Sequence, residues 1–384
     1  MEQLTTQEAL GLRQQALLLR EHDHTDPAGV VEWFGAMQAQ DVASGHWSFG
    51  ARLPGLTDAD IDQATHDRQI IRTWPMRGTI HFVPPKDVAW MLGLTGSVML
   101  KGVTKRWEYL GLDQAKVDAA QVALTKALAV DELLTRSQCL EVLAGAGLET
   151  AGQRGYHYLW HTAQIGAIVI GPQVSKEQTF ASAQRWLPSQ VTLDRDEALK
   201  TLAWRYFRSH GPATRKDFAG WTSLPAADVK AAITALDSKL TEVSVNNTPM
   251  YCPTALLDQL SAKGSNTQQT LNLNVLPGFD EYLLGYKDRT LMADSEVMAA
   301  VIPGGNGMFR STVVIDGTVR ATWKRTVKAK VIDVSVHTLG GWAPSRIEHS
   351  EMQKAFDSYG SYYSLPVRVD VESANKTPAP SRLN

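Results

Sequence analysis

The sequence predicts an α+β fold in which three helical units, each closed by a β-hairpin, precede a β-rich C-terminal region. Apolar residues first recur three and four apart, as on one face of a helix, and then alternate with polar residues, as in a strand. This change of spacing occurs three times before residue 263. From Gln268 onward, short β-prone runs separated by Gly and Asn replace the helical spacing. A chain of 384 residues accommodates four such parts. We place them at 1–100, 101–192, 193–262 and 263–370, with a frayed tail at 371–384.

The clearest unit lies between residues 194 and 253. Its first helix stops before Gly211-Pro212, its second starts after the N-cap candidate Thr214, and its third starts at Pro225. The spacing then alternates on both sides of Asn246-Asn247, which is typical of a hairpin. Three helices followed by a hairpin is the order of a winged helix, in which the second and third helices form a helix-turn-helix.

The same order recurs, less regularly, in the two preceding units. Helices are predicted over 5–20, 27–40 and 57–68 in the first unit, and over 113–130, 135–145 and 152–164 in the second. The first hairpin turns through Arg77-Gly78, and the second is broken at Gly171-Pro172. The prediction is therefore three tandem winged-helix modules.

The C-terminal region is predicted to be a small β-rich domain with one packing helix. Strands are expected within 271–279, 311–317, 318–325 and 329–339, and a helix within 345–363. Asp316-Gly317 between two of these strands is a strong signal for a two-residue hairpin turn.

The net charge alone argues mildly against a nucleic-acid partner, but the local distribution of charge favours one. The net charge is −2, whereas residues 310–330 carry six cations against Asp316 alone, and a binding surface uses only one face of a protein. The candidate phosphate contacts are Arg320, Lys324, Arg325 and Lys328 in this stretch, and Arg215 and Lys216 in the clearest unit. The alternative is a solvated surface whose charge is balanced by acids elsewhere.

Secreted and membrane proteins are disfavoured. Apolar runs fall short of the roughly 20 residues that a membrane span needs, and the N-terminus lacks the basic segment of a signal peptide. Cys139 and Cys252 cannot form a disulfide framework or a zinc cluster, and we expect both to be reduced and buried. We expect a cytoplasmic monomer.

Motifs for metal or cofactor sites are weak. His157 and His161 lie four apart on a predicted helix, but their aromatic neighbours favour core positions over metal ligands. The glycine-rich stretch at 304–307 lacks a following Lys-Ser/Thr, so we expect a flexible turn there and not a phosphate loop. No cofactor and no metal is predicted.

The run Met37-Gln38-Ala39-Gln40-Asp41 falls at the end of the predicted helix 27–40. Residues two apart on an ideal helix point about 200° from each other. Gln38 and Gln40 can therefore share a site only if the helix ends between them or just after them. By pattern alone, the two glutamines are an ordinary polar helix end.

Five long segments of the chain are distinctive, and they are spread from residue 33 to residue 325: WFGAMQAQDVASGHWSFGAR, IIRTWPMRGTIHFVPP, GPATRKDFAGWTSL, LPGFDEYLLGYKDR and DGTVRATWKR. Together they resemble the AlkZ family of bacterial winged-helix DNA glycosylases, which act on alkylated and crosslinked DNA. The resemblance implies tandem winged helices around a DNA channel and a catalytic Gln-x-Gln, which falls on Gln38 and Gln40. A related branch has Asp at the second position, so this chain is similar to the Gln-x-Gln branch, often linked to self-resistance against DNA-alkylating natural products. The implied partner is double-stranded DNA carrying alkylated purines, in the bacterial nucleoid.

The resemblance further implies a monofunctional glycosylase for N7- or N3-alkylated purines, with interstrand crosslinks as further candidate substrates. These bases are cationic and leave readily, so the enzyme needs mainly to stabilise an oxocarbenium-like sugar and to position a water. A glutamine carboxamide offers one acceptor oxygen and two donor hydrogens. Two glutamine carboxamides can therefore perform both tasks without a metal or a lysine Schiff base. Which glutamine stabilises the sugar and which positions the water stays open.

Arg77, Thr79 and His81 alternate along the first hairpin, so their side chains share one face. We interpret that face as lying beside the glutamines or against a DNA phosphate, and the alternative is a solvated surface. The competing function is a non-catalytic winged-helix regulator, although three different modules suit a palindromic site poorly. Asp280 and Glu281 lie in a matching segment and are expected to be structural.

Overall fold

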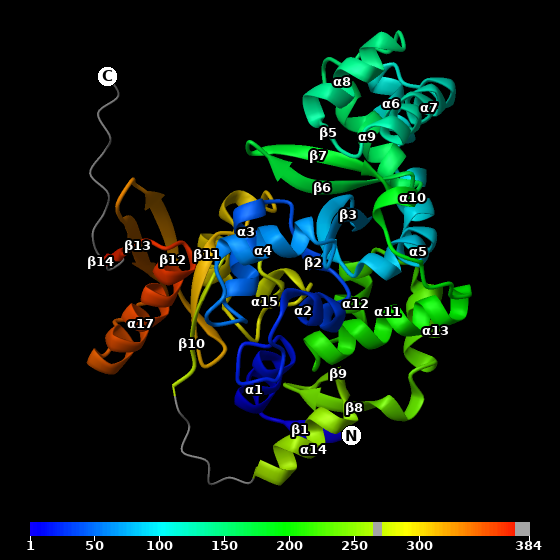
Figure 1. Ribbon diagram of the computed structural model, residues 1–384. Coiled ribbons are helices and arrows are strands. Elements are labelled where there is room, and N and C mark those ends of the chain that lie inside the picture. Colours follow the sequence, from blue (N-terminus) through cyan, green and yellow to red (C-terminus); the bar gives the residue numbers. More distant parts are fainter. Residues whose placement is uncertain (264–270, 373–384) are drawn as a thin grey trace.

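The fold is a mixture of helices and strands in a computed structural model that describes residues 1–263 and 271–372. One continuous hydrophobic core runs through the three helix-and-hairpin units and the C-terminal region. A smaller core joins the N-terminal residues to the hairpin of the third unit. In Figure 1 the second unit lies at the top, the first in the centre, the third at the lower right and the C-terminal sheet at the left.

The third unit has its elements in the predicted order. They are α11 (Arg195–His210), α12 (Arg215–Thr222), α13 (Ala226–Thr234), η2 (Asp237–Lys239), β8 (Leu240–Val245) and β9 (Thr248–Pro253), followed by α14 (Thr254–Lys263). Thr214 caps α12 in a reciprocal pair with Asp217. Asn246 and Asn247 have φ of 50° and 62°, as a tight hairpin turn requires. The N-terminal strand β1 (Glu2–Leu4) adds to this hairpin parallel to β8.

The first two units share one sheet. The first unit contains α1 (Thr6–Ala16), α2 (Pro27–Phe34), β2 (Met37–Gln38), α3 (Val42–Gly50), α4 (Asp58–His66), β3 (Ile71–Met76), β4 (Thr79–Val83), η1 (Pro85–Asp87) and α5 (Val88–Lys101). The second contains α6 (Thr104–Leu110), α7 (Gln114–Val130), β5 (Leu134–Thr135), α8 (Arg136–Gly145), α9 (Arg154–Gln164), β6 (Ile168–Val174), β7 (Glu177–Ser182) and α10 (Ala183–Trp186). The strand order is β2-β4-β3-β6-β7-β5. The two hairpins therefore pair with each other across the boundary that we placed at residue 100.

The predicted helix 27–40 is wrong at its C-terminal end, and the error falls on the candidate site. Helix α2 stops at Phe34, because Gly35 has a φ of +79° and a Cβ there would lie 2.7 Å from the Arg205 side chain. The chain then becomes extended, and Gln38 pairs with His81 of β4. The Asp41 side chain accepts the Ser44 N–H and starts helix α3, which was not predicted.

The C-terminal region is a five-stranded sheet with one long helix packed on it. Its elements are β10 (Leu273–Leu276), α15 (Glu281–Leu284), α16 (Ser295–Val301), η3 (Pro303–Gly305), β11 (Ser311–Ile315), β12 (Thr318–Val327), β13 (Ile332–Thr338), α17 (Arg346–Tyr362) and β14 (Val367–Glu372). The strands lie in sequence order, antiparallel except for β14, which was not predicted and runs parallel to β13. Asp316 and Gly317 form the predicted turn between β11 and β12. Most of the predicted tail, 373–384, lies outside the described residues.

Trp47 of α3 joins this region to the first unit. Its indole N–H donates to the Val275 carbonyl over 2.7 Å. Its ring packs edge-on against Tyr359 and Tyr362 of α17. The helix that follows the two glutamines is therefore packed against the C-terminal region.

The residues set aside as structural are buried. Cys139 and Cys252 are both buried and unpaired, as expected. His157 and His161 of α9 lie in the core, where His161 packs against Trp107. Within residues 1–263 and 271–372, no helix is both long and apolar enough to cross a membrane.

Candidate active site

Gln38 and Gln40 lie side by side against strand β4. The break in the helix at Gly35 lets both carboxamides reach β4, where neighbouring residues, Thr79 and Ile80, anchor them. The Thr79 hydroxyl donates to Gln38 Oε1 over 3.1 Å, and the Ile80 backbone N–H donates to Gln40 Oε1 over 3.0 Å. Gln38 is 8% exposed, whereas Gln40 is exposed. The pair therefore opens to solvent on the Gln40 side.

Both backbone polar groups of Ala39, between the two glutamines, have partners. Ala39 N–H donates to the Ile80 carbonyl over 2.8 Å, and the Ala39 carbonyl accepts from Arg72 Nη2 over 3.2 Å. Arg72 is buried, and burial lowers its pKa to about 10, so it stays charged at neutral pH. Sequence reasoning missed Arg72, although a charge inside the apolar run of β3 was an available signal.

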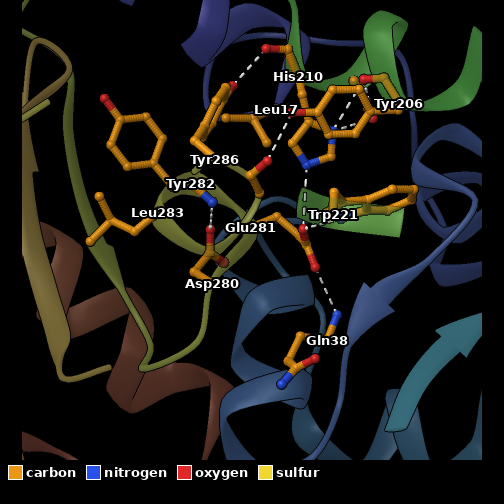
Figure 2. Close-up of polar contacts among 12 residues, drawn as sticks. Leu17, Gln38, Tyr206, His210, Trp221, Asp280, Glu281, Tyr282, Leu283 and Tyr286 are labelled. Carbon is orange, nitrogen blue, oxygen red and sulfur yellow. Dashed lines mark hydrogen bonds and ion pairs between the residues drawn. The ribbon is translucent and has the colours of Figure 1, made fainter. Parts of the chain in front are cut away.

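The N–H of Gln38 donates to a buried carboxylate from the C-terminal region. Glu281 Oε1 accepts it over 2.9 Å. Glu281 Oε2 accepts from the Trp221 indole N–H over 3.0 Å and lies 3.3 Å from His210 Nε2. Figure 2 shows Glu281 between Gln38 on one side and the Trp221 and His210 rings on the other.

Glu281 is ionised despite its burial. Burial alone raises the pKa of this carboxyl, but the hydrogen bond and charge of His210, followed by the charge of Arg77, outweigh burial and hold the pKa at about 2. We expected Glu281 to be structural because its segment matched the family without offering a mechanism. Its contact with Gln38 spans 243 residues and could not be deduced from local sequence.

Asp280, next to Glu281, anchors this segment to helix α3. Its two carboxylate oxygens accept from Arg52 Nη1 and Nη2 over 2.8 and 2.9 Å, and one also accepts from the Ser48 hydroxyl over 2.9 Å. Arg52 and Asp280 are both buried. A bidentate pair of this kind fixes both position and orientation, so it holds Glu281 at its distance from Gln38.

His81 is a neutral, fully buried residue. Arginine only donates, so His81 Nε2 must accept from Arg77 Nη2 (2.8 Å), and Nδ1 carries the proton donated to the Thr79 carbonyl (2.9 Å). Burial and the Arg77 charge lower the pKa of His81 to about 3. The predicted DNA contact by His81 is corrected here, because its exposed fraction is 0%. Arg77 is half-buried, and Thr79 faces Gln38.

Arg215 and Lys216 are exposed at the start of α12, as a phosphate contact requires. They line a cavity of about 880 Å³ between α12, the β8–β9 hairpin and residues 287–302. Lys287 and Arg289 add two further cations to its wall, and sequence reasoning did not single them out.

The basic end of β12 lies away from the predicted Asp316-Gly317 turn. That turn packs inward, where a Cβ on Gly317 would lie 2.7 Å from Leu10. Arg320 and Lys324 are exposed, and Lys328 is exposed and paired with Asp333 at the β12–β13 turn. Arg325 is less exposed than these three residues. Its guanidinium lies 4.9 Å from the centre of the Tyr363 ring and donates a hydrogen bond to the Tyr359 hydroxyl.

The chain is similar to known DNA repair enzymes over most of its length. A model of the DNA glycosylase AlkZ-like family matches residues 31–362. A relative named interstrand DNA cross-link repair glycosylase, from Streptomyces sahachiroi, is 26% identical over 329 residues, which cover 81% of this chain and 85% of the relative. The solved structure of Streptomyces sahachiroi DNA glycosylase AlkZ superimposes with a TM-score of 0.77 at 22% identity, over 96% of this chain and all of that one. The chain therefore belongs to the AlkZ-like family of DNA glycosylases.

Proposed function

We propose that this DNA glycosylase hydrolyses the N-glycosidic bond of cationic N7- or N3-alkylated purines in double-stranded DNA, with Gln38 and Gln40 as its catalytic residues. The observation that supports this most is the arrangement of the two carboxamides, whose oxygens are anchored by Thr79 and Ile80. Anchored in this way, they present fixed dipoles to a reacting sugar, and fixed dipoles stabilise developing charge without reorganisation.

The proposed reaction starts with the C1′–N bond. Its electron pair goes to the base, which loses its positive charge, and the sugar becomes oxocarbenium-like. A water adds to C1′ and releases a proton to solvent, which leaves the free base and an abasic site. Each glutamine oxygen accepts one protein hydrogen bond and keeps a second lone pair for the water or the sugar. The two glutamines share these tasks, and the reaction is monofunctional.

The choice of cationic bases follows from the ionisable groups beside the pair. His81 has a pKa of about 3 and Glu281 a pKa of about 2, so neither holds a proton that it could give to a base at neutral pH. A neutral purine needs such a proton to leave, whereas an N7- or N3-alkylated purine does not. The proposed selectivity therefore depends on the leaving group.

DNA binding is proposed to use exposed cations on two sides of the molecule. Arg215 and Lys216 mark one side, and Arg320, Lys324 and Lys328 mark the other. Such contacts give mostly sequence-independent affinity. Interstrand crosslinks are included among the substrates because the pair is open on the Gln40 side and the Streptomyces relative is named for their repair.

The test uses duplex DNA with one N7-methylguanine, excess enzyme, and detection of abasic sites by alkaline cleavage. Gln38→Ala and Gln40→Ala are each expected to slow base release about 100-fold or more, the usual effect of removing one stabilising dipole. Gln353→Ala, on the exposed face of α17, is the matched control and should behave like the wild type. Duplexes with hypoxanthine, a neutral base, should stay intact. Base release that survives the double substitution would overturn the site, and efficient release of hypoxanthine would overturn the proposed selectivity.

A further inference from the structure

Glu281 connects the C-terminal region, the third unit and the strand that carries Gln38. Its Oε1 takes the Gln38 N–H from β2, and its Oε2 takes the Trp221 N–H from α12 and faces His210 of α11. The carboxylate is 2% exposed, so it lies behind Gln38 and does not reach a substrate. Its possible influence on the reaction therefore passes through Gln38.

The surroundings of Glu281 require a carboxylate. Both of its oxygens must accept, because the Gln38 N–H and the Trp221 N–H are donors that cannot change role. A glutamine at this position could satisfy the Gln38 N–H, but its own NH₂ group would then face the Trp221 N–H. One of the two donors would lose its partner, and a buried unsatisfied donor is costly.

The backbone at Gln38 needs this contact to hold its place. Strand β2 has two residues and pairs only with β4 on one edge. On the other edge, Glu281 accepts the Gln38 N–H. Without this contact that edge of β2 loses its hydrogen-bond partner, and the Gln38 carboxamide shifts with the strand.

We propose that Glu281 is a positioning residue for Gln38, held in place by Trp221 and His210, so that the third unit sets the position of Gln38. This inference rests on the proposed function of Gln38. It predicts that a perturbation 2.9 Å behind the Gln38 backbone slows the reaction and leaves DNA binding unchanged. A misplacement of about 1 Å at a reacting group costs about 100-fold in rate.

The experiment measures single-turnover release of N7-methylguanine and, separately, the Kd for the same duplex. Glu281→Gln is expected to lower the rate about 100-fold. Trp221→Phe, which removes the N–H donor and keeps a smaller aromatic ring, is expected to lower it about 10-fold, as loss of one hydrogen bond to a charged group predicts. The Kd should change less than about threefold in both. Met352→Ala in the core of α17 is the control, because it destabilises the protein without contacting the site.

Combination with Gln38→Ala separates positioning from general damage. If Glu281 acts through Gln38, then Glu281→Gln should slow the Gln38→Ala enzyme by less than about threefold, because the two changes remove one interaction. Independent effects that multiply in the double variant, or a Glu281→Gln enzyme as fast as the wild type, would overturn the positioning role and leave the proposed function intact. A Gln38→Ala enzyme with full activity would overturn both. If the Glu281→Gln protein does not fold, Trp221→Phe takes its place, measured alone and in combination with Gln38→Ala.

Discussion

Thr79 holds the carboxamide of Gln38, and its hydroxyl can be removed with little other change. Thr79→Val keeps the β-branched shape that suits strand β4 and deletes only the donor to Gln38 Oε1, 3.1 Å away. A neutral hydrogen bond contributes about 0.5–1.5 kcal/mol, which corresponds to a rate loss of about 2- to 12-fold. Thr79 is partly exposed, so water can replace some of the interaction and the lower half of that range is expected.

The assay for Thr79 is single-turnover release of N7-methylguanine, with the Kd for the duplex measured beside it. Thr79→Ser keeps the hydroxyl and should retain most of the rate, which makes it the matched control. The sequence had suggested a DNA contact for Thr79, and that role would appear as a weaker Kd with an unchanged rate. Equal rates for Thr79→Val and the wild type, or equal losses in the Val and Ser variants, would refute the proposed role of this hydrogen bond.

Three further predictions concern pH, stability and salt. Because the pKa of His81 falls from 6.5 to about 3 on folding, its contribution to the free energy of unfolding is present above pH 6.5 and lost as the pH falls towards 3. The free energy of unfolding should fall by about 2 kcal/mol between pH 6.5 and 5. Urea titrations should show a smaller fall over that range for His81→Gln than for the wild type. Arg52→Met should lower the free energy of unfolding by about 3–5 kcal/mol, because it leaves Asp280 buried without its partner, and a second change to Asn at Asp280 should recover part of the loss. Lys324→Ala should reduce the slope of log Kd against log salt by about 0.9, whereas Arg325→Ala, which removes a stacked cation, should leave that slope unchanged.

Local signals predicted the third unit well. The Thr214–Asp217 cap and the left-handed Asn246-Asn247 turn each depend on residues within four positions of one another. Such features depend on short-range sterics and hydrogen bonds, which a sequence pattern contains. The resemblance to the glycosylase family, and with it the enzyme class, was equally accessible because whole segments matched, and the alternative of a non-catalytic regulator is no longer needed.

The candidate site was harder to predict because tertiary contacts decide it. The apolar spacing of α2 continues through Met37, so the pattern extended the helix past Gly35. The true end depends on the close approach of Arg205 to Gly35, from a helix 170 residues away in sequence. The prediction that the helix ends between the two glutamines or just after them is wrong, because the helix ends at Phe34, before both, and Gln38 lies on a strand instead. The pairing of β3 with β6 likewise joins hairpins that no local pattern connects.

The proposed catalytic pair is a product of the whole fold and not of the first unit. Gln38 ends a two-residue strand and Gln40 follows it, and a strand this short does not hold its own position. Strand β4 pairs with one edge of β2, and Arg72 of β3 binds the Ala39 carbonyl. Glu281 of the C-terminal region holds the Gln38 N–H on the other edge, and the third unit holds Glu281. These contacts join parts that are distant in sequence and share one core. The first unit, the third unit and the C-terminal region therefore build the candidate site together.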